Sequence, residues 1–381
     1  MKLEYFAESL AEICSRSAVA PGRLLRWAVI ANPTAGSFAM RSRWKKSRAA
    51  LDAGRIAAQA NPRREGCAPA AAAAEFGTDA ASAALFAGYG MIFTEGPRFA
   101  VKIAASIIKE IAAESNGSQP APFYLIVIAS GDGTSLEALS VLYHAPEAVR
   151  SNFAVIRLPM GTGNDGADSP SLAAALELIY KPARVELTPA LRLVTAPGGQ
   201  ACKQGPFLAF NILSVGLDAY VTYMTNKMKG KLPGDFYKLW VDIASLLYDR
   251  LYKVDYLDVK AVDRQGAETA SFREKILLLA VGASGRRTYG SQKKILPDDR
   301  NVCAVKQMPL LRKIALKGLF TTGAHAAKPE SILCSAHRVE FSGKHPILAQ
   351  MDGEATLLQP DDFPAAIELT EPAIPVLKLS V

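Results

Sequence analysis

The first half of the chain alternates short apolar runs with segments in which apolar residues recur at helical spacing. The runs of strand length are residues 24–31, 124–129 and 153–158. Residues 99–113 repeat apolar residues at the spacing of a helix. This alternation is typical of a parallel sheet with helices on both faces. We therefore predict an α/β domain over residues 24–175, preceded by an amphipathic helical extension at residues 1–23.

The pattern changes after Pro170, where the apolar runs become short, β-rich and irregularly spaced. A helix is expected at residues 171–180, and a longer one near residues 234–251. The β-rich runs are residues 183–187, 207–215, 256–262, 275–281, 338–341 and 347–351. Short strands separated by many turns favour an antiparallel sandwich. We predict a β-sandwich domain over residues 176–381, whose last strand is a candidate to return to the first domain, and a cleft between the two domains.

Length and composition fit this two-domain prediction. A chain of 381 residues is long enough for two cores of ordinary size. Half of the residues are hydrophobic and 21% are charged, which excludes disorder as the main state. Residues 52–90 are rich in alanine and lack strong periodicity, so we expect an insertion there.

Charge and cysteine usage narrow the class of protein further. The formal net charge of +8 suits anionic partners, although charge alone does not choose among phosphates, acidic lipid surfaces and nucleic acid. The densest basic cluster, residues 41–48, is expected to open a helix and to form an exposed face. The five cysteines and four histidines form no zinc pattern. No apolar run approaches the roughly 20 residues that span a bilayer. We expect a cytoplasmic protein that can associate peripherally with a membrane.

Glycine-containing turns follow each of the predicted strands. Ser130-Gly131-Asp132-Gly133-Thr134 follows the second strand, and Leu158-Pro159-Met160-Gly161-Thr162-Gly163-Asn164-Asp165 follows the third. A further turn, Asn32-Pro33-Thr34-Ala35-Gly36, follows the first strand. Glycine lets backbone N–H groups approach a phosphate at the carboxyl end of a strand, and aspartates can bind Mg²⁺ or take a proton. The turns indicate phosphoryl transfer.

A dinucleotide-binding enzyme is a rival interpretation of the third turn. Gly161 to Gly166 matches the GxGxxG pattern, and Glu186 stands downstream where such folds place a ribose-binding acid. Against this interpretation, Pro170 would fall within the helix that the last glycine should pack against. The sequence also contains neither a GxxxxGK[ST] loop nor an HRD catalytic loop, so a P-loop enzyme and a protein kinase are not supported.

Five segments in this order resemble the signatures of the diacylglycerol kinase catalytic domain family, which includes sphingosine, ceramide and bacterial lipid kinases. The segments are residues 32–36, 130–134 with Glu137, 158–165, 211–219 and 351–354. The resemblance implies a first domain like that of NAD kinases and phosphofructokinases and a C-terminal β-sandwich that contacts lipid. It also implies ATP and Mg²⁺ as cofactors and a lipid substrate at a membrane surface, with no nucleic acid partner.

The same resemblance implies roles for individual residues. Asp132, Glu354 and Asp165 would be catalytic, with either Asp132 or Glu354 taking the proton, and Asp218 would face the lipid headgroup. The residues implied to bind the nucleotide are Asn32, Gly36, Gly131, Gly133, Thr134, Gly161, Thr162, Gly163 and Asn164. The residues implied to bind metal are Asp132 and Asp352 for a catalytic Mg²⁺ and Asp298 and Asp299 for a structural Mg²⁺, although Arg300 stands where the family pattern has glycine.

The sequence leaves several alternatives open. Ser130 favours a sphingoid-type substrate, whereas the domain size favours diacylglycerol. An NAD kinase-like enzyme would carry an Asn-Glu pair, which this chain lacks. A catalytically silent regulator that binds lipid or nucleotide is a further alternative, against which the retained carboxylates argue. The stretch from Lys227 to Lys231, beside Met224 and Met228, is a candidate membrane-facing edge, and a homodimer is a candidate assembly.

Overall fold

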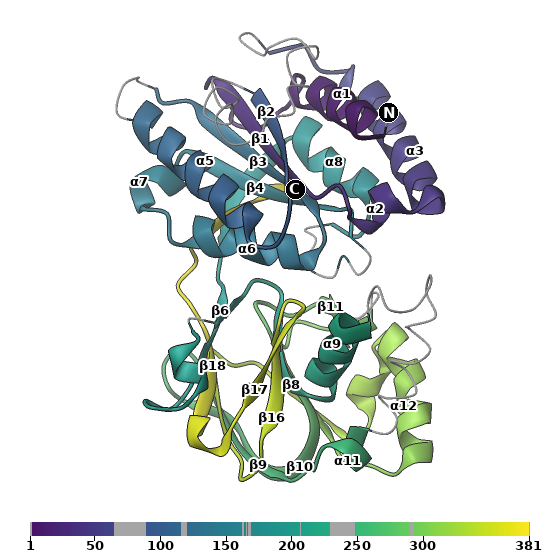
Figure 1. The fold of residues 1–381 in the computed structure, drawn as a ribbon, viewed down its shortest axis with the longest axis vertical. Helices are drawn as coiled ribbons and strands as arrows, with labels where there is room; N and C mark the ends of the chain where they lie inside the picture. Colours follow the sequence, from purple (N-terminus) through teal and green to yellow (C-terminus); the bar gives the residue numbers. More distant parts are fainter. Residues whose placement is uncertain are drawn as a thin grey trace. The chain divides into compact units, whose positions relative to one another are not determined.

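The computed structural model describes residues 2–64, 89–115, 120–161, 164, 166, 169–205, 207–228, 248–289 and 293–380. The chain divides into two compact units (Figure 1). The first unit comprises Met1–Thr188 and Pro372–Val381, and the second comprises Pro189–Glu371. Among the described residues, no helix has the length and apolar character needed to cross a membrane.

The first unit contains a six-stranded sheet of order β2-β1-β3-β4-β19-β5. The strands are β1 (Leu25–Ala31), β2 (Tyr89–Phe93), β3 (Phe123–Ser130), β4 (Phe153–Pro159), β5 (Ala183–Thr188) and β19 (Ile374–Leu379). All neighbouring pairs are parallel except β19 and β5, which are antiparallel. Every residue of β3 is buried, as expected for a strand covered by helices on both faces. The three strands predicted in the first half of the chain are all present.

Helices cover the two faces of this sheet (Figure 1). They are α1 (Lys2–Cys14), α2 (Gly36–Ala39), α3 (Arg41–Ala58), α5 (Phe99–Ser115), α6 (Asp132–Tyr143), α7 (Glu147–Arg150) and α8 (Leu172–Tyr180). Helices α1, α3 and α8 contact one another, and α5 contacts α6 and α7. The side chain of Ser171 caps α8 by accepting a hydrogen bond from the backbone N–H of Ala174.

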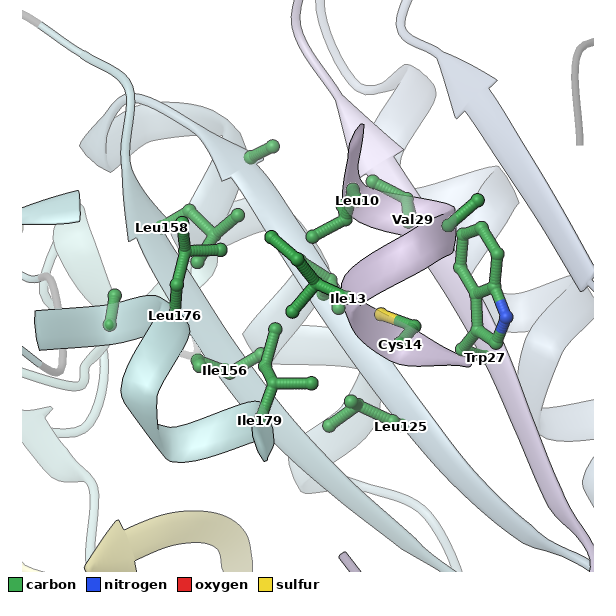
Figure 2. Packing of buried hydrophobic residues seen from close by; sticks show 14 of the residues in the cluster. Leu10, Ile13, Cys14, Trp27, Val29, Leu125, Ile156, Leu158, Leu176 and Ile179 are labelled. Atoms are coloured by element: carbon green, nitrogen blue, oxygen red, sulfur yellow. The ribbon is translucent and has the colours of Figure 1, made fainter. Parts of the chain in front are cut away.

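Helix α1 belongs to the core of the first unit. The prediction that residues 1–23 form an extension outside the α/β domain is therefore corrected. Phe6, Leu10, Ile13 and Cys14 are fully buried. Figure 2 shows Leu10 and Ile13 within the cluster that also contains side chains of the sheet and of α8. An amphipathic period predicts the helix but does not show which surface covers its apolar face.

The observed boundaries differ from the predicted ones in two further places. The first segment of the first unit extends to Thr188 rather than to residue 175, because β5 pairs along its length with β19 from the end of the chain. The last strand thus lies in the first unit. Helix α3 continues to Ala58, so the start of the alanine-rich stretch is ordinary helix, with Leu51 and Ala58 buried. Residues 65–88 of that stretch lie outside the described residues.

The second unit contains an eleven-stranded antiparallel sheet. Most of its strands follow the order β17-β16-β8-β10-β9-β15-β18-β6-β7. Strand β13 lies off this path and pairs with β10 and β14. The strands are β6 (Leu191–Val194), β7 (Phe207–Ala209), β8 (Ile212–Gly216), β9 (Tyr256–Val262), β10 (Glu268–Gly282), β13 (Val302–Lys306), β14 (Ser331–Cys334), β15 (Arg338–Ser342), β16 (Ile347–Met351), β17 (Glu354–Leu358) and β18 (Ala365–Leu369). A separate ribbon joins β11 (Arg287–Tyr289) to β12 (Lys293–Leu296).

The long strand β10 connects two halves of this sheet. Its first part pairs with β9, and its second part pairs with β8 and β13. Inward side chains of both halves, such as Val259 and Phe341 on one side and Val215 and Met351 on the other, share one hydrophobic cluster. This shared core agrees with the antiparallel sandwich predicted from the sequence.

Helices flank the sheet of the second unit. They are α9 (Leu217–Met228), α11 (Tyr248–Leu251) and α12 (Leu310–Thr322), with short 3₁₀ helices η2 (Ala201–Lys203), η3 (Ala324–Ala327) and η4 (Pro360–Asp362). Helix α9 contacts β8, β16 and β17. The long helix predicted near residues 234–251 is described only from residue 248 onward, and its earlier part lies outside the described residues.

Candidate phosphate-binding and lipid-binding sites

The two glycine turns of the first unit are in direct backbone contact. Strands β3 and β4 are parallel neighbours, with Ser130 opposite Pro159. A Cβ atom on Gly161 would lie 2.5 Å from the Cα of Gly131, which no real side chain tolerates. Only glycine therefore fits at position 161. The contact keeps the backbone of both turns free of side-chain atoms on the facing surfaces, as a phosphate-binding edge requires.

Asp132 occupies the first turn of α6, which begins at this residue. Gly131 is the N-cap residue and supplies no side-chain hydrogen bond. A carboxylate in the first turn of a helix is stabilised by the helix dipole. The Oδ1 atom of Asp132 accepts a hydrogen bond of 3.1 Å from the backbone N–H of Gly166. Asp132 thus links the two turns.

The loop that follows β1 joins the same edge of the sheet. The Nδ2 group of Asn32 donates to Thr134 Oγ1 over 3.1 Å, and Asn32 Oδ1 accepts from the backbone N–H of Thr34 over 2.9 Å. Gly36 begins the short helix α2. The next residue, Ser37, donates its backbone N–H to Met160 O over 2.8 Å. The loop after β1 and the two glycine turns therefore lie against one another at one edge of the sheet.

Asn164 adds an acceptor to the second glycine turn. Its backbone has a positive φ of 60°, a conformation that asparagine adopts more readily than most residues. Its Oδ1 atom is buried and has no hydrogen-bond partner among the described residues. A buried acceptor without a donor is costly, so Oδ1 is suited to a ligand or bound water. Thr162, Gly163 and Asp165 lie outside the described residues, and their roles stay predictions.

The sequence assigned no role to Arg43 and named Glu137 only as part of the signature at residues 130–134. Arg43 on α3 donates from Nη1 to the carbonyl oxygen of Gly161 over 3.1 Å, although residues 41–48 were expected only to form an exposed face. Glu137 on α6 accepts a hydrogen bond of 2.8 Å at Oε1 from the backbone N–H of Arg98. The sequence feature that could have pointed to Arg43 is its position on the helix that follows the Asn32 loop. Nothing local in the sequence indicates its contact with Gly161.

In the second unit, Asp352 and Gly353 form a two-residue turn between β16 and β17. Both have positive φ, 45° and 101°, as in a type I′ hairpin, for which Asp-Gly is a preferred pair. The Asp352 carboxylate is buried and accepts hydrogen bonds from the backbone N–H groups of Phe210, Asn211 and Ile212. These bonds fasten the hairpin to the β7–β8 corner. They give Asp352 a structural role, and its predicted role as a ligand of Mg²⁺ finds no support in this geometry.

The hairpin places Glu354 next to the segment that carries Asp218. Glu354 is the first residue of β17 and is exposed. Asp218 lies in the first turn of α9 and accepts at Oδ2 from Ser214 Oγ over 2.6 Å. Asn226, also on α9, donates to the carbonyl oxygen of Gly353 over 2.8 Å. The second unit therefore gathers two of its predicted site residues around one helix and one hairpin.

Asp298 and Asp299 are paired with arginines. Asp298 contacts Arg300 over 2.5 Å, and Asp299 contacts Arg286 over 2.7 Å. The hydrogen bond from Arg300 lowers the pKa of Asp298 to about 2. The described residues contain no group of three or more metal-ligating side chains that could hold a metal ion. Guanidinium groups therefore provide the positive charge here, and the predicted structural Mg²⁺ is not supported by these contacts.

These features define a chain with an α/β unit, whose glycine turns meet at one edge of its sheet, and an antiparallel β unit that carries further acidic groups. Residues 26–184 match the family model described as the diacylglycerol kinase catalytic domain. The match agrees with the resemblance stated from the sequence over these residues. No curated protein matches the chain.

Solved structures share the fold at low sequence identity. One described as a "putative diacylglycerol kinase from Bacillus anthracis str. Sterne" is 17% identical, with a TM-score of 0.52 over 92% of this chain and 96% of that chain. A second structure of the same description is 18% identical, with the same TM-score and coverage. A yeast NADH kinase complexed with NADH is 9% identical, with a TM-score of 0.36 over 95% of this chain and 87% of that one, a similarity too low to carry an argument.

Proposed function

We propose that the protein is an ATP-dependent lipid kinase that phosphorylates a hydroxyl group of diacylglycerol or a related sphingoid-type lipid. The observation that carries the proposal is the contact between the two glycine turns, with Asp132 at the start of α6 and Asn32 bonded to Thr134. This arrangement supports phosphate binding, and the family match over residues 26–184 supports a kinase.

The residues at the edge of the first sheet suit the phosphates of ATP. Gly131 and Gly161 leave the backbone open, and the N-terminus of α6 presents N–H groups with a favourable dipole. The Oδ1 atom of Asn164, which has no hydrogen-bond partner within the described parts of the chain, offers an acceptor that a water molecule or a metal-bound water could satisfy. Asp132 is the carboxylate proposed to hold Mg²⁺ among these groups, and Mg²⁺ would neutralise charge on the phosphates during transfer.

Phosphoryl transfer depends mostly on alignment and charge neutralisation. The lipid hydroxyl must also lose its proton, for which a positioned carboxylate is suited. Asp132 and Glu354 are the two candidates for this proton. Asp218, whose carboxylate is fixed by Ser214, is proposed to accept a hydrogen bond from the lipid headgroup.

A lipid substrate requires the protein to work at a membrane surface. The basic stretch that begins at Lys227 is proposed as one point of contact, and a homodimer is the proposed assembly. Only Lys227 and Met228 of that stretch, at the end of α9, lie within the described residues. Charge reversal at Lys227 should weaken binding to vesicles that contain anionic lipid, which a sedimentation assay measures.

The proposal is tested by incubating the purified protein with radiolabelled ATP, Mg²⁺ and a panel of diacylglycerol, sphingosine, ceramide and NAD. Label should enter a lipid, and Asp132→Asn should lower kcat by at least about 100-fold while the protein stays folded. Label entering NAD alone would make the protein an NAD kinase. ATP binding without label in any acceptor would make it a catalytically silent regulator.

A further inference from the structure

Gln350 lies at the centre of a buried hydrogen-bond network in the second unit. Its side chain is fully buried on β16. The amide nitrogen Nε2 donates to Ser214 Oγ over 2.9 Å and to Asp218 Oδ2 over 3.4 Å. The amide oxygen Oε1 accepts from the backbone N–H of Gly353 over 3.1 Å. Both ends of the amide therefore make hydrogen bonds, the nitrogen to residues of β8 and α9 and the oxygen to the hairpin between β16 and β17.

On the nitrogen side, the network leads to the start of α9. Gln350 lies directly opposite Ser214 in the pairing of β16 with β8. Ser214 is also fully buried, and its hydroxyl accepts from Gln350 while it donates to Asp218 Oδ2 over 2.6 Å. One carboxylate oxygen thus receives hydrogen bonds from two buried groups, which restricts the rotation of the Asp218 side chain.

On the oxygen side, the network leads to the hairpin that presents Glu354. The Gly353 N–H that donates to Gln350 belongs to the residue directly before Glu354. Asn226 on α9 binds the carbonyl oxygen of the same Gly353. Asp352, beside it, is held by the backbone of residues 210–212. The backbone before Glu354 is therefore fixed from several directions.

The orientation of the Gln350 amide follows from its partners. If the amide were flipped, its oxygen would face the Asp218 carboxylate and its NH₂ group would face the N–H of Gly353. Both contacts would be repulsive, so only the observed orientation satisfies the network.

We propose that Gln350 is a positioning residue that holds the Asp218 carboxylate and the Gly353–Glu354 backbone in one fixed arrangement for lipid binding. The inference rests on the proposed function in that it takes Asp218 and Glu354 to act on the lipid. Gln350 itself touches neither reactant in this account. It acts through Asp218, Ser214 and Gly353.

The substitution Gln350→Glu tests this role because it changes the shape of the side chain very little. An ionised carboxylate would stand beside Asp218 and would compete for the Ser214 hydroxyl, whereas a protonated one can donate as the amide does. We expect the KM for short-chain diacylglycerol to rise by about 10-fold at pH 8 and to recover toward the wild-type value at pH 5.5, with the KM for ATP unchanged at both pH values.

Gln307 provides a matched control in the same unit. Its Nε2 donates to Asp249 Oδ2 over 2.6 Å, so Gln307→Glu also places a second acid beside an aspartate. The lipid KM of Gln307→Glu should match the wild-type value at pH 8 and at pH 5.5. A lipid KM that rises equally in the two variants, or that rises in Gln350→Glu without recovery at pH 5.5, would overturn the positioning role.

Two measurements do not depend on turnover. In Gln350→Leu, hydrogen exchange at Gly353 and Glu354 should be about 10-fold faster than in the wild type, and binding of dioctanoylglycerol, measured by calorimetry, should weaken. Unchanged exchange, or faster exchange with unchanged lipid binding, refutes the inference. A wild-type protein that binds dioctanoylglycerol but phosphorylates no lipid refutes the proposed function alone, and one that does not bind it refutes the inference as well.

Discussion

Single glycines decide whether the two turns at the edge of the first sheet can meet. Replacement of Gly161 by alanine would put Cβ 2.5 Å from the Cα of Gly131 and 3.1 Å from Asn164 Oδ1. One of the turns must then move. We expect Gly161→Ala to weaken ATP binding by at least about 10-fold and to destabilise the first unit by about 1–3 kcal/mol, as measured by nucleotide titration and urea denaturation.

Gly96→Ala is the control for this prediction. A Cβ atom at Gly96 would meet no atom within 4 Å, so ATP affinity and stability should stay close to those of the wild type. If Gly161→Ala bound ATP as tightly as Gly96→Ala does, the contact between the glycine turns would have no role in nucleotide binding.

A carboxylate on α5 has a pKa that makes stability depend on pH near neutrality. Burial and the neighbouring charge of Glu114 raise the pKa of Glu110 to about 7. Glu114 itself is paired with Arg26 over 2.8 Å and accepts from the hydroxyl of Tyr124 over 2.5 Å. Since the folded state holds the Glu110 proton more tightly than the unfolded state, stability falls as the pH rises from about 4.5 to about 7.

We therefore expect Glu110→Gln to stabilise the protein at pH 8 and to change its stability little at pH 4. The gain at pH 8 should be on the order of 1–2 kcal/mol after allowance for solvent screening. Urea denaturation at the two pH values measures it. Glu114→Gln, which breaks the pair with Arg26, should instead destabilise the protein at pH 8. A gain for Glu110→Gln that is the same at pH 4 and pH 8 would disprove the pH argument.

At the scale of elements, the turn between β12 and β13 is held by arginine–aspartate pairs. Because Arg300 and Arg286 neutralise Asp298 and Asp299, we expect neither EDTA nor added Mg²⁺ to shift the Tm of the second unit by more than about 1 °C. Arg300→Gly should remove the competing cation and make the Tm rise with Mg²⁺. A drop in the wild-type Tm on EDTA treatment would show that metal binds here despite the arginines.

Helix α1 should contribute to stability as a core helix. Leu10 is fully buried, whereas Leu311 on α12 is 82% exposed. Leu10→Ala should therefore cost about 2–5 kcal/mol in the free energy of unfolding, and Leu311→Ala should cost less than about 0.5 kcal/mol. Thermal and urea denaturation compare the two variants. Equal costs would mean that α1 contributes little to the core.

The elements predictable from the sequence are those whose signal is local. Strands β1, β3 and β4 are mostly apolar, with Arg26 in β1 and Arg157 in β4 as exceptions, because both faces of the sheet are covered. The turns at the carboxyl ends of parallel strands must share one edge. The sequence indicated β structure at residues 183–187 but not that β5 belongs to the first unit. Its run is half polar, and its partner β19 lies almost at the other end of the chain. Non-local pairing leaves no trace in a short window of sequence.

The candidate site residues also divide into those with a local signal in the sequence and those without one. The glycines and Asp132 could be assigned to turns from the sequence because turn chemistry restricts which residues can stand there, and their roles in a site stay predictions. The Asp352-Gly353 pair was recognised by resemblance, yet its carboxylate binds backbone amides from β7 to β8, a contact that only the folded chain shows. Arg43 and Gln350 were missed because an arginine in a basic helix and a glutamine in a strand have no distinctive pattern.

For the whole molecule, the division into units predicts which fragments fold. Pro189–Glu371 is contiguous and has its own hydrophobic cores, so it should fold alone and melt cooperatively. Residues 1–188 alone lack β19, the strand between β4 and β5, and should not form a stable sheet. Circular dichroism and amide dispersion in NMR spectra check both. A stable fragment 1–188 would show that β19 is dispensable.

The position of β19 has a consequence for synthesis. The ribosome produces β1 to β5 first, then all of Pro189–Glu371, and only then the strand that lies between β4 and β5. At roughly 5–20 residues per second, the first unit waits about 10–40 s with an open edge on β4. The unit translated second is thus the first that can finish folding, and during this interval the nascent first unit exposes a strand edge that is open to pairing with other chains.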